Sequence, residues 1–124
     1  RLRALVEEGG NPPPPDRVHL VRQIVDSLAL ALANTVRSAE RLSGRDVEVI
    51  HVVGGGSRIG LLCQLLASAT GVPVIAGPVE ATAMGNVLVQ ARAYGTLTGD
   101  LEVLRELVRD SQRLARYEPS APGP

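Results

Sequence analysis

The strongest constraint on the fold comes from four consecutive segments in the middle of the chain. A nearly continuous β-branched run, VEVIHVV, occupies residues 47–53, and a glycine cluster, GGGSRIG, follows it at 54–60. Residues 59–70 have the apolar spacing of a helix that ends at Gly71, and residues 72–76 read VPVIA. This order predicts two buried parallel strands joined by a crossover helix. We therefore expect an α/β fold.

A long helix is expected before this unit, over residues 16–44. Asp16 is a suitable N-cap and Gly44 is a suitable stop. One face has apolar residues at 3-4 spacing and is predicted to face the core. This face comprises Val18, Val21, Val25, Leu28, Leu32, Thr35, Ala39 and Leu42. The middle stretch, SLALALA, is apolar on most sides, which predicts burial on more than one face. A coiled-coil seam is the alternative, although Thr35 and Ala39 would weaken it.

Two further helices are expected in the C-terminal third, over residues 79–95 and 99–119, the second with Asp100 as its N-cap. Residues 1–8 predict a short helix. The proline-rich residues 11–16 predict either a solvent-exposed linker or a rigid loop that aims the long helix. The resulting order is helix, strand, helix, strand, helix, helix. Two strands are too few for a stable open sheet, which indicates half of a sheet domain.

Side chains of the β-α-β unit receive structural roles. The leucines predicted to face the core from the helix at 59–70 are Leu61, Leu62, Leu65 and Leu66. His51 is predicted to be packed and hydrogen-bonded inside its strand, because no second His or Cys lies at the spacing of a metal ligand. We therefore expect no metal ligands in this chain.

Charge and composition limit the partners. The chain carries 13 basic and 13 acidic residues, which argues against a nucleic-acid-binding arm or an anchor to an anionic membrane. The sequence contains no apolar run of about 18 residues, so we expect no membrane span. Cys63 is the only cysteine, which fits a reducing compartment, and we expect a cytoplasmic protein. Tyr94 and Tyr117 are the only aromatic residues, a first hint that a partner surface is missing.

The glycine cluster does not match the two common phosphate-binding fingerprints. The dinucleotide pattern fails from Gly54, because Ile59 stands at its last glycine position, and it fails from Gly55, because Ser57 stands at its second. The P-loop pattern fails because Leu61 stands where lysine is required. Two interpretations remain from the residues alone: a turn whose backbone lets an anionic ligand approach closely, or a tight strand-to-helix turn without a ligand.

A longer stretch carries a more specific likeness. HVVGGGSRIGLLCQLLASATGVPVIAGPVEATAMGN, with its GGGS turn, its LLxQ and its AGPVEATAMGN, resembles the adenosine-motif region of the FGGY carbohydrate kinases, and within them the rhamnulokinase group. VRQIVDSLALAL resembles the long helix of that family, and GDLEVLRELVRDS…RYEP resembles its C-terminal helix. The likeness covers residues 1–119, and we expect 120–124 to be a flexible tail.

The resemblance implies the C-terminal portion of the second domain of an actin-like, ribonuclease-H-like ATPase fold. It implies a sugar kinase that uses ATP with Mg²⁺ to phosphorylate L-rhamnulose or a related sugar at a primary hydroxyl. Gly54, Gly55 and Gly56 match glycines that pack against the nucleotide, and Ser57 matches the residue that starts the next helix. Ile59 stands where the family usually has Asn, whose amide contacts the adenine side. An isoleucine can neither donate nor accept that hydrogen bond.

The resemblance also implies that the phosphate loop, the sugar site and the catalytic aspartate lie outside this chain. We therefore expect no catalytic residue within it and no kinase activity from it alone. The alternative is a non-catalytic binding or assembly module, or a degenerate kinase remnant, that self-associates. In both cases we expect the isolated chain to be a homo-oligomer, because an open sheet edge and an apolar long helix need cover.

Overall fold

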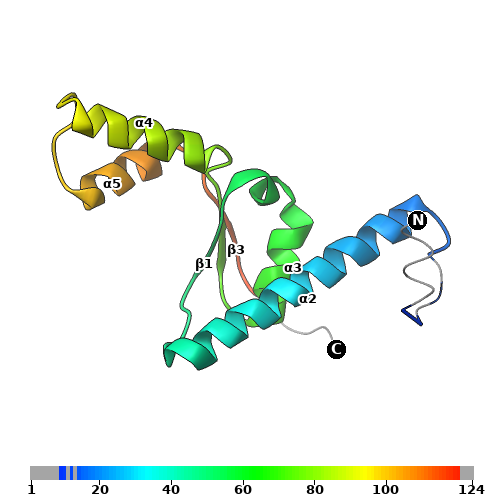
Figure 1. Cartoon of the computed structure of the whole chain (residues 1–124). Coiled ribbons are helices and arrows are strands. Elements are labelled where there is room, and N and C mark those ends of the chain that lie inside the picture. The colour runs from blue at the N-terminus through cyan, green and yellow to red at the C-terminus, as the bar shows by residue number, and fades with distance from the viewer. Residues whose placement is uncertain (1–8, 11, 13, 121–124) are drawn as a thin grey trace.

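The computed structural model describes residues 9, 10, 12 and 14–120. Its elements, in chain order, are α2 (Arg17–Ser43), β1 (Ile50–Val52), the short 3₁₀ helix η1 (Gly54–Arg58), α3 (Gly60–Thr70), β2 (Val74–Ala76), α4 (Ala81–Ala93), α5 (Leu101–Ser111) and β3 (Ala115–Tyr117) (Figure 1). The mixed α/β class expected from the sequence is confirmed. The helix predicted over residues 1–8 lies outside the described residues.

The sheet has the order β1-β2-β3 among the residues described. β1 and β2 are parallel, with Ile50 opposite Val74, as the β-α-β pattern predicted. β3 is antiparallel to β2, with Val74 opposite Tyr117. The prediction of a helix through residue 119 was wrong at this point. The helix ends at Ser111, and the next residues are drawn into the sheet because pairing with β2 satisfies their backbone.

The long helix begins and ends where its capping residues predicted. The side chain of Asp16 accepts a hydrogen bond of 2.9 Å from the backbone N–H of His19. Gly44 adopts the left-handed conformation (φ 66°), and its N–H donates to the carbonyl of Glu40 over 2.8 Å. Local chemistry therefore sets both ends of α2.

The face of α2 that packs inward differs from the predicted face. Its buried residues are Ala29 and Ala33, whereas Val18, Val21, Leu28 and Leu42 from the predicted face are exposed. Small side chains let α2 approach α3 closely, and the core of buried residues then joins Ala33 to α3 and β2. This core consists of Ala33, Cys63, Leu66, Ala67, Val74 and Ala76. Since SLALALA is apolar on most sides, its pattern could not say which side is covered.

Two predictions for the β-α-β unit were also wrong. Leu61 is 42% exposed, while Leu62 and Leu66 are buried as expected. His51 is exposed rather than packed, and β1 is only partly buried. Ile50 and Val52 pack against the core beside α3, so His51, between them in the strand, faces the opposite side of the sheet. That side is where the α4–α5 pair lies (Figure 1).

Candidate functional site

The glycine turn lies directly beyond β1, at the carboxyl end of the parallel strands. Gly54 adopts φ 75°, a conformation that L residues with a side chain rarely take. Its N–H donates to the carbonyl of Pro78 over 3.1 Å, and the N–H of Gly77 donates to the carbonyl of Val52 over 2.8 Å. The turns after β1 and β2 are therefore tied together. Open α/β sheets bind ligands at this end of their strands.

Ser57 holds the turn together from the inside. It is the one buried polar residue among those described, and its hydroxyl donates to the carbonyl of Gly54 over 2.6 Å. The N–H of Ile59 donates to the carbonyl of Gly56 over 3.1 Å, which closes the turn before α3 begins. The structure thus brings the predicted site residues Gly54, Gly55, Gly56 and Ser57 into one compact turn.

Gly55 offers the most open backbone in this turn. A Cβ atom built on Gly55 would meet no other atom within 4 Å, and its φ is not in the left-handed region. A Cβ on Gly56 would lie 3.7 Å from Cγ1 of Val52, which is ordinary contact. The N–H of Gly55 lies in the first turn of η1, where a helix supplies no acceptor of its own. The fold therefore does not require glycine at position 55. The absence of a side chain there leaves room for a ligand to approach the backbone closely.

Ile59 and Arg58 form the outer side of the turn. Ile59 is 43% exposed and stands at the N-cap of α3, where its side chain makes no capping hydrogen bond. It therefore presents an apolar surface beside the glycines. Arg58 is exposed, and within residues 14–120 no ion pair or hydrogen bond of its side chain is found. Sequence reasoning did not single out Arg58, although its place inside GGGSRIG was a signal for it.

Titratable groups do not gather around the turn. Across the described part of the chain, no three or more His, Cys, Asp or Glu residues are close enough to hold a metal ion. Cys63 is buried under the turn, and its burial raises the pKa of its thiol. Its Sγ lies 4.0 Å from the carbonyl of Gly56, so the thiol supports the turn by packing. The donor set of these residues does not fit a Mg²⁺ site of their own.

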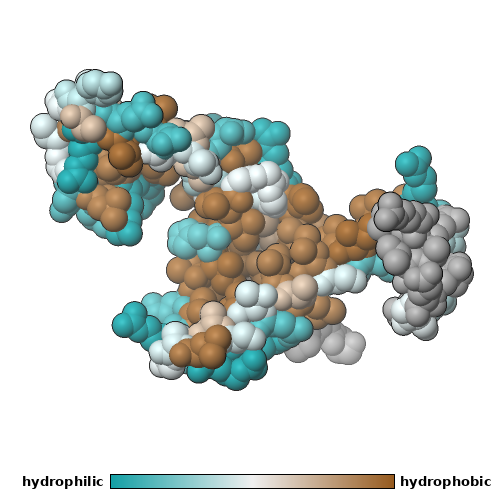
Figure 2. Space-filling view, in the orientation of Figure 1, coloured by the Kyte–Doolittle hydropathy of each residue, from teal (hydrophilic) through white to brown (hydrophobic). Residues whose placement is uncertain are grey.

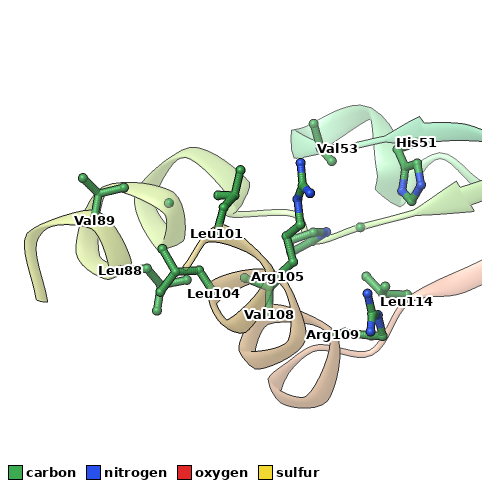
Figure 3. A pocket seen from close by; sticks show the side chains of 13 residues that line it. His51, Val53, Leu88, Val89, Leu101, Leu104, Arg105, Val108, Arg109 and Leu114 are labelled. Atoms are coloured by element: carbon green, nitrogen blue, oxygen red, sulfur yellow. The ribbon is translucent and has the colours of Figure 1, made fainter. Parts of the chain in front are cut away.

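Sequence reasoning missed a cavity on the side of the sheet that faces away from α2 and α3. It has a volume of about 650 Å³ and lies between the exposed side of β1 and the α4–α5 pair (Figure 3). Its lining is mostly apolar, with Val53, Leu88 and Leu104 among its walls, and His51, Arg105 and Arg109 supply its polar groups. Only the tertiary arrangement of β1, α4 and α5 brings these residues to one cavity.

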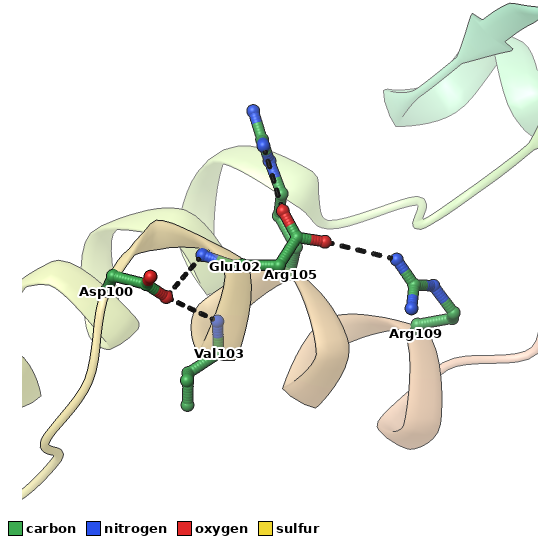
Figure 4. Close-up of polar contacts among 5 residues, drawn as sticks. All are labelled: Asp100, Glu102, Val103, Arg105 and Arg109. Carbon is green, nitrogen blue, oxygen red and sulfur yellow. Dashed lines mark hydrogen bonds and ion pairs between the residues drawn. The ribbon is translucent and has the colours of Figure 1, made fainter.

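The charges at this cavity are partly balanced on α5 itself. Glu102 lies 3.2 Å from Arg105 and 3.7 Å from Arg109, measured between carboxylate oxygens and guanidinium nitrogens (Figure 4). Asp100 caps the helix by accepting from the N–H groups of Glu102 and Val103 over 3.0 and 3.2 Å. The side chains of Glu102, Arg105 and Arg109 are each more than half exposed, so these ion pairs contribute little to stability.

Comparisons with known proteins identify the family. Residues 3–94 match the C-terminal domain of the FGGY family of carbohydrate kinases. A rhamnulokinase of Bacteroides thetaiotaomicron is 44% identical over 118 residues, which is 95% of this chain and 24% of that protein. Rhamnulokinases of Klebsiella pneumoniae and Pectobacterium atrosepticum are 36% and 39% identical over 96% and 97% of this chain, and again 24% of their own length.

The chain therefore spans about a quarter of the length of the curated relatives it matches. Within the part that the structure describes, no helix is both long enough and apolar enough to cross a membrane. The matched region contains the glycine turn and both parallel strands. The chain belongs to the FGGY family of carbohydrate kinases, as part of its C-terminal domain.

Proposed function

We propose that this chain forms the C-terminal part of an ATP-dependent sugar kinase, in which the turn at Gly54–Gly56 lies against the adenosine part of ATP. The single observation that carries the proposal is Gly55, whose backbone is open although the fold would accept a side chain there. Its position at the carboxyl end of two parallel strands supports the same assignment. The similarity to rhamnulokinases favours L-rhamnulose or a related sugar as the phosphoryl acceptor.

Each residue of the turn has a distinct role in this proposal. Gly54 gives the turn its shape, Gly55 lets the nucleotide approach, and the buried Ser57 keeps the turn rigid. Ile59 offers an apolar contact where the family usually has an amide. Preorganised backbone of this kind positions a nucleotide without taking part in bond making.

The remaining parts of the reaction belong to residues outside this chain. Mg²⁺ bound with ATP would supply charge neutralisation at the phosphates, and its protein ligands would come from outside the described residues of this chain. The general base that takes the proton from the sugar hydroxyl is also expected there. We accordingly propose a cytoplasmic enzyme in its full-length form, with the isolated chain inactive toward sugars.

A second candidate function is a binding or assembly module without nucleotide affinity. Ile59 favours it, because this side chain removes a hydrogen bond that the family usually makes to the adenine side. The apolar surface left uncovered on α2 favours it as well. The two candidates differ in one property, which is binding of Mg-ADP at the glycine turn.

An NMR titration of the 124-residue chain with Mg-ADP separates them. We expect saturable shifts of the amides of Gly54, Gly55 and Gly56, and their loss in Gly55→Ala, because a methyl group would block close approach. Gly85→Ala is the matched control: Gly85 lies in α4, and a Cβ there also meets no atom within 4 Å. If neither the wild-type chain nor Ile59→Asn shifts at millimolar nucleotide, the module is the better description.

A further inference from the structure

The N-terminal half of α2 carries an apolar stripe that no other described part of the chain covers. The stripe consists of Val18, Val21, Ile24 and Leu28, and we refer to it as the α2 stripe. These side chains are 76%, 59%, 42% and 44% exposed. Val21, Ile24 and Leu28 follow the 3-4 spacing that places side chains on one side of a helix. Figure 2 shows one face of the molecule, on which hydrophobic residues gather over the middle and continue onto α2.

Among the residues that the structure describes, the closest contacts of α2 with the rest of the molecule lie in its middle and C-terminal half. The buried residues of this helix are Ala29 and Ala33. Nη2 of Arg37 donates to the carbonyl of Ala69 over 2.6 Å, which ties the same half to the end of α3. The N-terminal half continues this anchored helix and leaves apolar side chains exposed to water. A partner surface that covered them would stabilise the protein.

The chemistry of the stripe restricts the kind of partner. Arg22 and Asp26 lie beside it and pair with each other, with 2.9 Å between Nε and Oδ1. The four side chains of the α2 stripe are themselves uncharged. Such a surface does not recognise phosphate or an anionic membrane, and it suits the apolar surface of a protein.

The length of the relatives supplies the candidate occupant. This chain matches only 24% of the Bacteroides thetaiotaomicron rhamnulokinase, and the matched domain is described as C-terminal. The large remainder of such a kinase has no counterpart among the described residues. The sheet also has a free edge at β1, because this strand pairs only with β2 in the part of the molecule described. The backbone groups at this edge can therefore pair with a further strand.

We propose that the α2 stripe docks onto the part of an FGGY kinase that precedes the matched segment, and that this contact completes the domain. The inference rests on the proposed function, because it assumes a full-length kinase of the rhamnulokinase kind. A second copy of this chain would occupy the stripe only when that part is missing.

Co-expression tests the contact. The 124-residue chain is produced together with the Bacteroides thetaiotaomicron rhamnulokinase from which the matching quarter has been removed. We expect a one-to-one complex, and an at least tenfold lower yield of complex with Leu28→Asp, because a carboxylate would be buried without a partner. Leu107→Asp is the matched control. Leu107 is 42% exposed on α5, against 44% for Leu28, and lies beyond the region that matches the family.

A single-chain hybrid keeps the test decisive if the shortened relative is insoluble. Residues 1–124 then replace the matching quarter within that rhamnulokinase, and thermal unfolding is followed. We expect Leu28→Asp to lower Tm by about 5 °C or more, and Leu107→Asp by clearly less. Equal effects of the two variants in both formats would overturn the proposal, as would a stripe-dependent homodimer that excludes the remainder of the kinase.

The proposal for the nucleotide site and the proposal for the docking surface can be refuted independently of each other. Gly55→Ala should leave the complex and its Tm unchanged while removing Mg-ADP binding. Leu28→Asp should reduce assembly whether or not nucleotide is added. Assembly without nucleotide binding would therefore reject the proposed function of the glycine turn and leave the docking surface standing.

Discussion

Ile59 presents an apolar side chain beside the glycine turn, where the family resemblance implies an amide. Ile59→Asn restores a group that can both donate and accept a hydrogen bond. We expect Mg-ADP to bind about 2- to 10-fold more tightly, because one hydrogen bond contributes roughly 0.5–1.5 kcal/mol. Calorimetric titration of the isolated chain measures the change. Unchanged or weaker binding would mean that the adenine does not reach position 59.

Cys63 lies fully buried beneath the same turn, and burial raises the pKa of its thiol. A raised folded pKa means that the unfolded chain ionises first as the pH rises. Stability linked to Cys63 is therefore present below about pH 8.5, the ordinary pKa of a thiol, and decreases above it. We expect a thiol reagent to label Cys63 slowly at pH 8 and much faster in urea. Native labelling as fast as that of a free cysteine would contradict the burial.

At the scale of elements, α3 links the long helix to the sheet. Leu66 is 2% exposed within the core cluster, and Leu61 on the same helix is 42% exposed. We expect Leu66→Ala to lower the free energy of unfolding by about 2–5 kcal/mol, because it leaves a cavity. Leu61→Ala should change it by less than about 1 kcal/mol. Urea unfolding of the two variants compares them, and similar losses would show that Leu61 is covered in solution.

We expect the start of α2 to be sensitive to acid. Two hydrogen bonds from His19 hold the pKa of the Asp16 carboxyl below its usual value. The larger effect comes from the backbone N–H of His19, and the smaller one comes from its imidazole ring. The folded pKa is lowered, so the cap contributes above the unfolded pKa of about 3.9 and is lost as the pH falls through the folded value. Amide shifts of residues 17–20 should report this fraying.

Asp16→Asn serves as the matched variant for this helix start. Asparagine is also a good N-cap, and it does not titrate. The variant should therefore keep the first turn of α2 and remove its acid dependence below about pH 4. Equal acid dependence in Asp16→Asn would assign the effect to other carboxylates.

At the scale of the whole molecule, the uncovered surfaces predict self-association of the isolated chain. The α2 stripe and the free edge of β1 both need cover when no partner is present. We expect at least a dimer by light scattering at micromolar concentration, and a shift toward monomer in Leu28→Asp. A monomeric mass for the wild-type chain would count against this prediction, which extends the sequence-based expectation for an open sheet edge and an apolar long helix.

The sequence by itself determined the features that depend on neighbours along the chain. Asp16 and Gly44 mark the ends of α2 because caps act through residues three or four positions away. The β-branched runs around GGGSRIG predicted the parallel β1–β2 pair, and the same motif carried the family resemblance that the match over residues 3–94 confirmed. Whether the turn binds nucleotide stays a prediction.

Only the tertiary structure decided what depends on distant partners. The segment at Ala115–Tyr117 has local spacing compatible with a helix, yet it pairs with β2 some 40 residues earlier in the chain. The inward face of α2 follows from Ala29 and Ala33 meeting α3, and the exposure of His51 follows from which side of β1 the core occupies. Periodicity describes which side chains share a face, whereas burial depends on what packs against that face.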